Sequence, residues 1–221
     1  MTHPIASCSS PKPTPAAPGR PKDLGKGAAI LEAAKHLFIV HGFEGVSMDQ
    51  IAAEAGVSKL TVYSHFGDKE ALFAAAVKAH CERQLPDSLF VADLDTPLRE
   101  RLLQIAGAFF SMISAPEAVA GHRIMCTPKM ADSPLPAMFW EAGPRRVQDA
   151  FAELLARRVA TGELQIPDLA RASSQFFTLL KGEPHAQLVF GCSDAMCAQA
   201  VQTHLAETVD LFLRAYAPSR R

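Results

Sequence analysis

Apolar residues along most of this chain recur every three or four positions, the spacing that places side chains on one face of an α-helix. The first such run covers residues 24–41, and Gly42 is expected to end it. Its apolar face consists of Ile30, Ala33, Ala34, Leu37 and Phe38. No segment shows the strict alternation of a half-buried strand. The pattern therefore predicts an all-α fold.

Two short helices are predicted next, over residues 47–54 and 58–66. Ser47 is a favourable N-cap, and Gln50 stands three residues later, as in a capping box. Gly56 supplies the left-handed residue that ends the first short helix. Two short helices joined by a glycine-containing turn are typical of a helix-turn-helix that reads DNA, and an ordinary helical corner is the alternative.

The second short helix indicates which side chains face the protein core. Ser58 is expected to cap it, and Val62 and Phe66 lie one turn apart on its inner face, together with Val57 just before it. The positions that remain outward or sideways are Lys59, Leu60, Thr61, Tyr63, Ser64 and His65.

The helical pattern continues to the end of the chain. Asp68 is expected to cap a fourth helix that Pro86 stops. Further helices are predicted at about residues 96–114, 117–126 and 136–161, from residue 168 onwards, and at 193–216, with Thr96, Asp168 and Ser193 as caps. Gly143-Pro144 and the Gly182/Pro184 pair are expected to disturb the helices that contain them.

One group of residues matches a known family. These residues are Ala29-Ile30-Leu31, Ala33-Ala34, Leu37-Phe38, Gly42-Phe43, Ile51-Ala52, Ala55-Gly56-Val57-Ser58, Val62-Tyr63, Phe66, Lys69-Glu70 and Leu72. With them, residues 22–84 resemble the DNA-binding part of the TetR family of bacterial regulators. A weaker resemblance to the AefR-type members rests on Gly19-Arg20-Pro21-Lys22-Asp23, Glu141-Ala142-Gly143-Pro144 and the segment Val209–Tyr216.

The resemblance suggests a division of the chain and a function. Residues 1–21 are proline-rich and contain almost no large apolar residue, so we expect a disordered arm. Residues 22–84 would form the DNA-binding domain, and residues 85–221 a helical domain for ligand binding and dimerisation. The implied protein is a homodimeric repressor that binds near-palindromic double-stranded DNA and is released by a small hydrophobic or aromatic effector.

The expected DNA contacts divide into base readers and backbone anchors. By resemblance, Lys59 and Tyr63 contact bases or adjacent phosphates, and Leu60 lies against a thymine methyl group. Thr61, His65 and Lys69 are interpreted as phosphate anchors, and Arg20 and Lys22 of the arm as contacts to the minor groove or backbone. The full set is Arg20, Lys22, Ser47, Ser58, Lys59, Leu60, Thr61, Tyr63, Ser64, His65 and Lys69.

The second half contains aromatic and sulfur-bearing residues that suit a pocket between helices, although such residues are also common in an ordinary core. The predicted ligand residues are Phe109, Met112, His122, Met125, Phe139, Trp140, Gln175 and Phe176, with Arg123 as a further polar candidate. A stripe on the last helix, Val201, Leu205, Val209 and Phe212, is predicted to pair two subunits. The alternative is that the stripe packs only within its own domain.

Composition excludes several other classes. With 48% hydrophobic and 20% charged residues the chain is globular, and a formal net charge of −1 argues against non-specific coating of nucleic acid. Five cysteines without a CxxC pair, and no apolar segment long enough to span a bilayer, predict a cytoplasmic protein. We expect no metal, no cofactor and no enzymatic centre. Two alternatives stay open: a ligand-independent regulator, and a small-molecule-binding protein with a vestigial helix-turn-helix.

Overall fold

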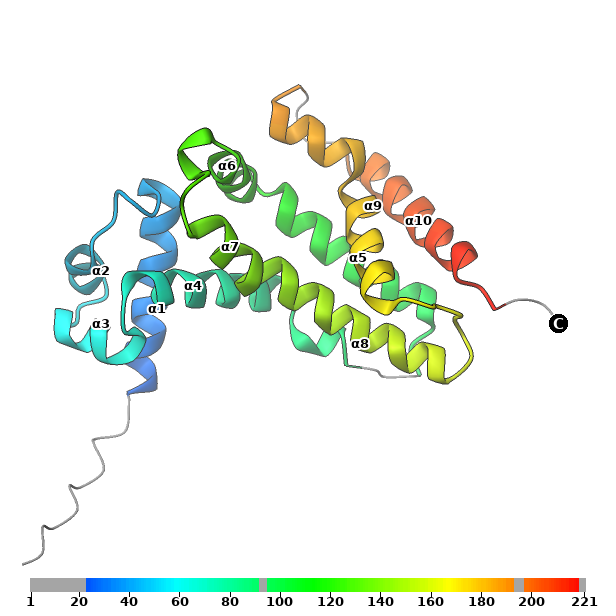
Figure 1. Cartoon of the computed structure of the whole chain (residues 1–221), viewed down its shortest axis with the longest axis horizontal. Helices are drawn as coiled ribbons and strands as arrows, with labels where there is room; N and C mark the ends of the chain where they lie inside the picture. Colours follow the sequence, from blue (N-terminus) through cyan, green and yellow to red (C-terminus); the bar gives the residue numbers. More distant parts are fainter. Residues whose placement is uncertain (1–22, 92–94, 193–196, 219–221) are drawn as a thin grey trace, which may run out of the picture.

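The computed structural model describes residues 23–91, 95–192 and 197–218, and every regular element in these ranges is helical (Figure 1). The predicted all-α fold is confirmed. The α-helices are α1 (Leu24–His41), α2 (Met48–Glu54), α3 (Lys59–Phe66), α4 (Lys69–Gln84), α5 (Leu98–Ser114), α6 (Pro116–Met125), α7 (Leu135–Trp140), α8 (Arg146–Ala160), α9 (Leu169–Phe190) and α10 (Ala198–Ala215). Short 3-10 turns, η1 (Asp87–Leu89) and η2 (Pro128–Met130), and a π-helical turn, η3 (Glu141–Arg145), complete the chain.

Helices α1, α2 and α3 with the first turn of α4 enclose a small core of their own, and we call this unit the reading head. Ile30 of α1, Ile51 of α2, Val62 of α3 and Leu72 of α4 are fully buried in it. Side chains three or four residues apart on each helix point inward, so the predicted spacing is what assembles this core. The reading head lies at one end of the molecule (Figure 1).

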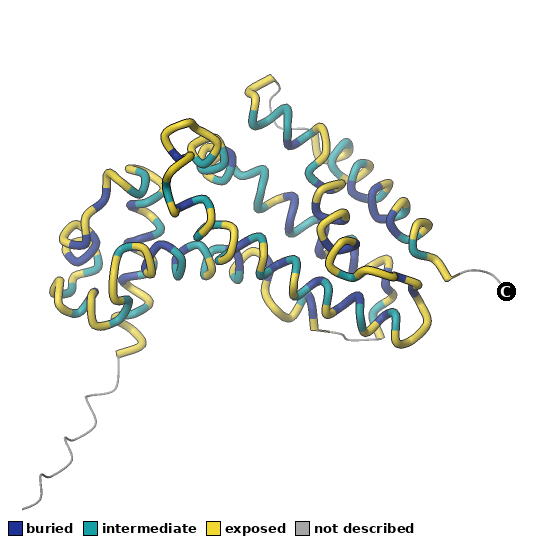
Figure 2. Tube along the Cα trace, viewed as in Figure 1, coloured by how far each residue is buried: buried dark blue, intermediate teal, exposed yellow. Residues whose placement is uncertain are grey.

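The second half has a larger core around α9. Helices α5, α8 and α10 all pack against α9, and α5 also packs against α10. The most deeply buried side chains include Leu102 and Ile105 of α5, Phe151 and Leu155 of α8, Phe176 and Leu180 of α9, and Val209 and Phe212 of α10. Figure 2 shows these buried stretches in dark blue along the helices of the second half.

Helix α4 connects the two cores. It packs against α1 on the side of the reading head and against α7 and η3 on the other side. Phe73 of α4 joins Met130 and Leu135 in a third, smaller cluster. A displacement of α4 would therefore change the packing of both the reading head and the second half.

The predicted helix ends agree with the structure where a local cap defines them. Asp23, Ser47, Ser58, Asp68 and Asp168 each accept a hydrogen bond from a backbone N–H of the helix that follows, and Ser47 with Gln50 forms the complete capping box. Gly42 and Gly56 have the positive φ angles, 70° and 65°, that suit glycine after a helix.

One predicted cap is wrong, and another lies outside the described residues. Helix α5 begins at Leu98 without a side-chain cap, and the Thr96 hydroxyl instead accepts a hydrogen bond from Arg101 at 3.2 Å. Helix α10 begins at Ala198 after Cys197, and the predicted cap Ser193 lies outside the described residues. In the first case Pro97, with its fixed φ, sets the start of the helix.

The two proline sites disturb their helices in different ways. Pro144 is accommodated by the π-helical turn η3 between α7 and α8, because the wider turn tolerates the missing N–H. In α9 the break falls at Gly182, whose backbone angles (φ 48°, ψ −160°) are not helical. Within the described part of the chain no single helix is long and apolar enough to cross a membrane, although α5 and α6 together meet that test across a 68° bend.

Candidate nucleic-acid interface

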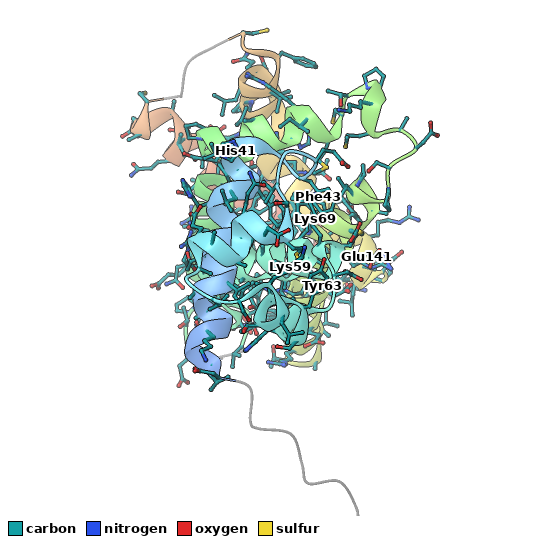
Figure 3. All side chains as sticks on the ribbon, turned by 90° about the vertical axis from the view of Figure 1, so that its left-hand side faces the viewer. His41, Phe43, Lys59, Tyr63, Lys69 and Glu141 are labelled. Atoms are coloured by element: carbon teal, nitrogen blue, oxygen red, sulfur yellow. The ribbon has the colours of Figure 1, made fainter. Side chains whose placement is uncertain are left out.

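The outer face of α3 is exposed on the surface of the reading head. Lys59, Leu60, Tyr63 and Ser64 are all exposed, while Val62 between them is fully buried. Leu60 is 79% exposed, which is unusual for so large an apolar side chain. Because a helix turns by 3.6 residues, this set forms one continuous strip. Figure 3 looks onto this end of the molecule and shows Lys59 and Tyr63 on the side turned towards the viewer.

Thr61 and His65 flank the strip and are only half-exposed. The hydroxyl groups around them form a local network. The Ser58 Oγ accepts a hydrogen bond from the Thr61 N–H at 3.2 Å and lies 2.8 Å from the Thr61 hydroxyl, and the Ser64 hydroxyl donates to the Thr61 carbonyl at 2.8 Å. The hydroxyl oxygens of Ser58 and Thr61 are therefore already engaged in shaping the start of α3.

Lys59 forms an ion pair across the helix-turn-helix. Its Nζ lies 2.7 Å from Oδ2 of Asp49 in α2, and the hydrogen bond to Asp49 raises the pKa of Lys59 above its usual value. Both side chains are well exposed, so the pair adds little to stability but does direct the ammonium group. The sequence reasoning did not find Asp49, although an acidic residue in the first turn of α2 is the signal for it.

Lys69 is held by an aromatic ring. Its Nζ lies 4.2 Å from the centre of the Phe43 ring, within the range of a cation–π contact. Phe43 in turn packs against Phe38 and Phe73, with ring centres 5.7 and 5.4 Å away. Figure 3 shows Phe43 and Lys69 beside each other above Lys59. The contact between Lys69 and Phe43 was not predicted from the sequence, although Phe43 belongs to the Gly42-Phe43 motif.

Three other predicted DNA contacts have different outcomes. Ser47 is exposed, but its hydroxyl is occupied by the capping box with Gln50. Arg20 and Lys22, predicted to act from the arm, lie outside the described residues. The remaining predicted contacts all lie on α3 or at the start of α4, within one part of the reading head.

The structure does not bring the eight predicted ligand residues to one point. Phe109 and Phe176 are buried in the large core with Met112 against them, whereas Met125 and Phe139 pack on the small cluster around Phe73. Trp140 is exposed on α7, Gln175 is exposed and accepts a hydrogen bond from the Tyr216 hydroxyl at 2.7 Å, and His122 packs against His185. Arg123 is engaged with the end of α9, where it donates to two backbone carbonyls.

Two open grooves lie near α7. One, of about 570 Å³, is lined by Ala74, Ala75 and Lys78 of α4 together with Ala137, Met138, Glu141 and Ala142. The other, of about 540 Å³, is bounded by residues between Met125 and Ala137. Met125 is the one predicted ligand residue that lines either of these two grooves.

The predicted pairing stripe must be corrected. Leu205, Val209 and Phe212 are buried in the core of their own chain, and Val201 packs against the same core. Spacing along one helix shows which residues share a face, but not whether the same chain or another covers that face. The large apolar residues that α9 and α10 do expose are Leu179, Phe190 and Leu211.

The geometry of the reading head defines the class of protein. A capped short helix, a glycine turn and a second short helix with an exposed strip, all held on a common core, form a helix-turn-helix DNA-binding domain. Residues 30–76 match the family model of bacterial regulatory proteins of the TetR family, and residues 100–218 match the C-terminal domain of AefR-like transcriptional repressors. The chain belongs to the TetR family of transcriptional regulators.

Individual relatives agree with this assignment. The solved structure of the flavonoid-responsive regulator FrrA is 34% identical and superposes with a TM-score of 0.70, over 88% of this chain and 98% of that one. A TetR-family regulator from Mesorhizobium loti is 27% identical with a TM-score of 0.72, over 87% and 96% of the two chains. The transcriptional activator FasR of Mycolicibacterium smegmatis is 28% identical over 137 residues, which are 62% of this chain and 61% of FasR.

Proposed function

We propose that the chain is a homodimeric, sequence-specific repressor whose α3 enters the major groove of its operator. The observation that carries the proposal is the exposed strip of α3, which projects away from a fully packed core. An α-helix fits the major groove, and base edges there offer a distinct pattern of donors, acceptors and methyl groups. The exposed Leu60 would meet a thymine methyl group, and Lys59 and Tyr63 would meet polar base edges.

The remaining polar residues would hold the reading head on the DNA backbone. Lys69 is supported by Phe43 and has its ammonium group at the edge of the strip, which suits a phosphate contact. Thr61 and His65 lie on the flank of α3 and suit the same role. We include Arg20 and Lys22 as further backbone or minor-groove contacts on the strength of their charge alone.

We divide the chain functionally near the end of α4, with residues 22–84 reading DNA and residues 85–221 sensing an effector and pairing two copies. The exposed apolar residues of α9 and α10 support pairing through these two helices. The name of FrrA, flavonoid-responsive, supports an aromatic effector here also, and the grooves beside α4 and α7 offer space next to the helix that links both cores. An effector would release DNA only if it binds the non-operator conformation more tightly.

A gel-shift titration with the DNA upstream of this chain's own gene tests the proposal. Wild-type protein should form a specific complex that survives excess unrelated DNA, whereas Leu60→Glu should abolish the specific complex because it places a carboxylate against the major groove. Lys129→Ala, an exposed change in η2, is the matched control and should bind as the wild type does. A vestigial helix-turn-helix would show equal, weak binding for all three proteins.

A further inference from the structure

Three basic side chains lie close together where α6 meets the broken middle of α9. They are His122 of α6, and Lys181 and His185 of α9, which we call the basic cluster. The rings of His122 and His185 meet edge to face with centres 5.4 Å apart. Residue His185 is only 6% exposed, and Lys181 and His122 are half-buried. Lys181 and His185 are four residues apart, with the non-helical Gly182 between them.

The basic cluster has no acidic partner in the part of the chain that the structure describes. Over the described ranges none of these three side chains forms a hydrogen bond or an ion pair. Each neutral imidazole carries one N–H donor, and the Lys181 ammonium group carries three. The basic cluster therefore has unused donors that it can offer to the oxygen atoms of an anion.

The lowered pKa values of the basic cluster also favour an anionic ligand. Burial, together with the nearby His122 and Lys181, lowers the pKa of His185 to about 4. Burial also lowers the pKa of His122 and of Lys181, and Lys181 adds to the effect on His122. Without a ligand the three groups disfavour one another's charged forms. A bound anion would reverse this by stabilising the protonated forms.

The backbone around the basic cluster is held in place from both sides. Arg123, next to His122, donates to the carbonyls of Leu188 and Val189 at 2.6 and 2.7 Å and so fixes α6 on the C-terminal end of α9. On the other side, Nε2 of His204 lies 2.9 Å from the Leu180 carbonyl, next to the break. The cluster is thus pre-organised, which reduces the entropic cost of binding.

We propose that His122, Lys181 and His185 form a binding site for the carboxylate of a small organic acid. Charge-assisted hydrogen bonds from a protonated imidazole and an ammonium group to carboxylate oxygens are among the strong ones available to a protein. The identification of this acid as the effector rests on the proposed function, whereas the binding of the acid to the basic cluster does not.

The site makes binding depend on pH with a definite sign. In the free protein the histidine pKa values are lowered, so the rings are neutral at pH 8. Binding of a carboxylate raises these pKa values and takes up protons, and by linkage the affinity rises as the pH falls. The rise in affinity ends near pH 5, because below that pH the carboxylate of the ligand begins to take up a proton and lose its charge.

Calorimetric titration of the DNA-free, full-length protein with benzoate, and with neutral benzamide of the same shape, tests the site. We expect benzoate to bind at least threefold more tightly at pH 6 than at pH 8, and benzamide at least tenfold more weakly than benzoate at pH 6. Lys181→Met retains most of the apolar stem and His185→Gln retains a polar group, and each should weaken benzoate binding at least tenfold. Lys129→Met removes an exposed charge in η2 and should leave it unchanged.

Several outcomes would overturn the proposal. These are the absence of benzoate binding at millimolar concentration, equal affinity for benzamide, or an unchanged affinity in Lys181→Met. Stabilisation of the protein by zinc alone, without any response to benzoate, would instead identify a metal site at the two histidines. Because no DNA is present, each of these results leaves the gel-shift test of the proposed function unaffected.

Discussion

Lys59 and Lys69 carry the same charge on the reading head in different surroundings. Asp49 of α2 holds the Lys59 ammonium group across the helix-turn-helix, 2.7 Å from the Asp49 carboxylate. Lys69 instead rests on the Phe43 ring, which neutralises no charge and leaves the ammonium group available to a phosphate. The neighbours of the two lysines therefore suggest separate roles that their charge alone does not.

Replacing these lysines one at a time should separate backbone contact from base reading. We expect Lys69→Ala to weaken binding to all DNA sequences by a similar factor and to reduce the slope of log affinity against log salt by about 1. Lys59→Ala should change the preference at one or two base pairs, by about 1–3 kcal/mol. Titrations of a panel of operator variants at several salt concentrations measure both effects. Equal behaviour of both variants and the wild type would contradict this orientation of α3.

At the scale of an element, Gly182 defines the shape of α9. Its φ of 48° and ψ of −160° belong to a region that residues with a Cβ rarely adopt, and an added Cβ would lie 3.2 Å from the His204 ring. Gly121 in α6 is the opposite case, because an added Cβ there meets no atom within 4 Å and the backbone is helical. The same substitution at the two sites therefore tests the break directly.

Gly182→Ala should lower the free energy of unfolding by about 1–3 kcal/mol, because the strained backbone must be kept or the break lost. Gly121→Ala should raise it by roughly 0.5–1 kcal/mol, since alanine restricts the unfolded chain and favours the helix. Thermal unfolding followed by circular dichroism measures both. A Gly182→Ala protein as stable as the wild type would mean that the break in α9 is not required.

The helices themselves were predictable because their signals are local. Ser47 with Gln50, Ser58, Asp68 and Asp168 each form their cap within a few residues of the chain, and the structure has them as expected. What depends on distant partners was not predictable. The contact between Lys59 and Asp49 joins two helices. The contact between His185, beyond the break in α9, and the ring of His122 on α6 is likewise not visible in the spacing along α9.

At the scale of the whole molecule, the sequence likewise does not show what covers an apolar face. Phe109, Phe176, Leu205 and Phe212 have the periodicity of a functional face, yet they fill the core of their own chain. Periodicity places side chains on one side of a helix, and only the packing of the other helices decides whether core, ligand or partner lies there. The sequence therefore predicts the family and the reading helix well, but not the residues that pair or bind an effector.

Pairing of two copies belongs to this scale, because a single helix-turn-helix reads too few base pairs to be specific in a genome. Two reading heads on one face of DNA need half-site centres about 34–36 Å apart, which a two-fold dimer can set. We expect the dimer to form through the exposed apolar residues of α9 and α10, where Leu179 and Leu211 are 41% and 47% exposed. Burial of such residues between copies supplies the driving force of association.

Leu179→Glu combined with Leu211→Glu should yield a folded monomer, because both side chains lie outside the core of the chain and their charges would repel across a two-fold axis. Leu60→Glu, which changes a more exposed leucine on α3, should leave the dimer intact and remove DNA binding. Sedimentation velocity at micromolar concentration and gel shifts on the same samples separate the two effects. A wild-type chain that sediments as a monomer would contradict pairing, and a double variant that stays dimeric would place the pairing surface elsewhere.

If the double variant is monomeric, its operator affinity should fall at least a hundredfold, because each reading head then binds without the effective concentration that its partner provides.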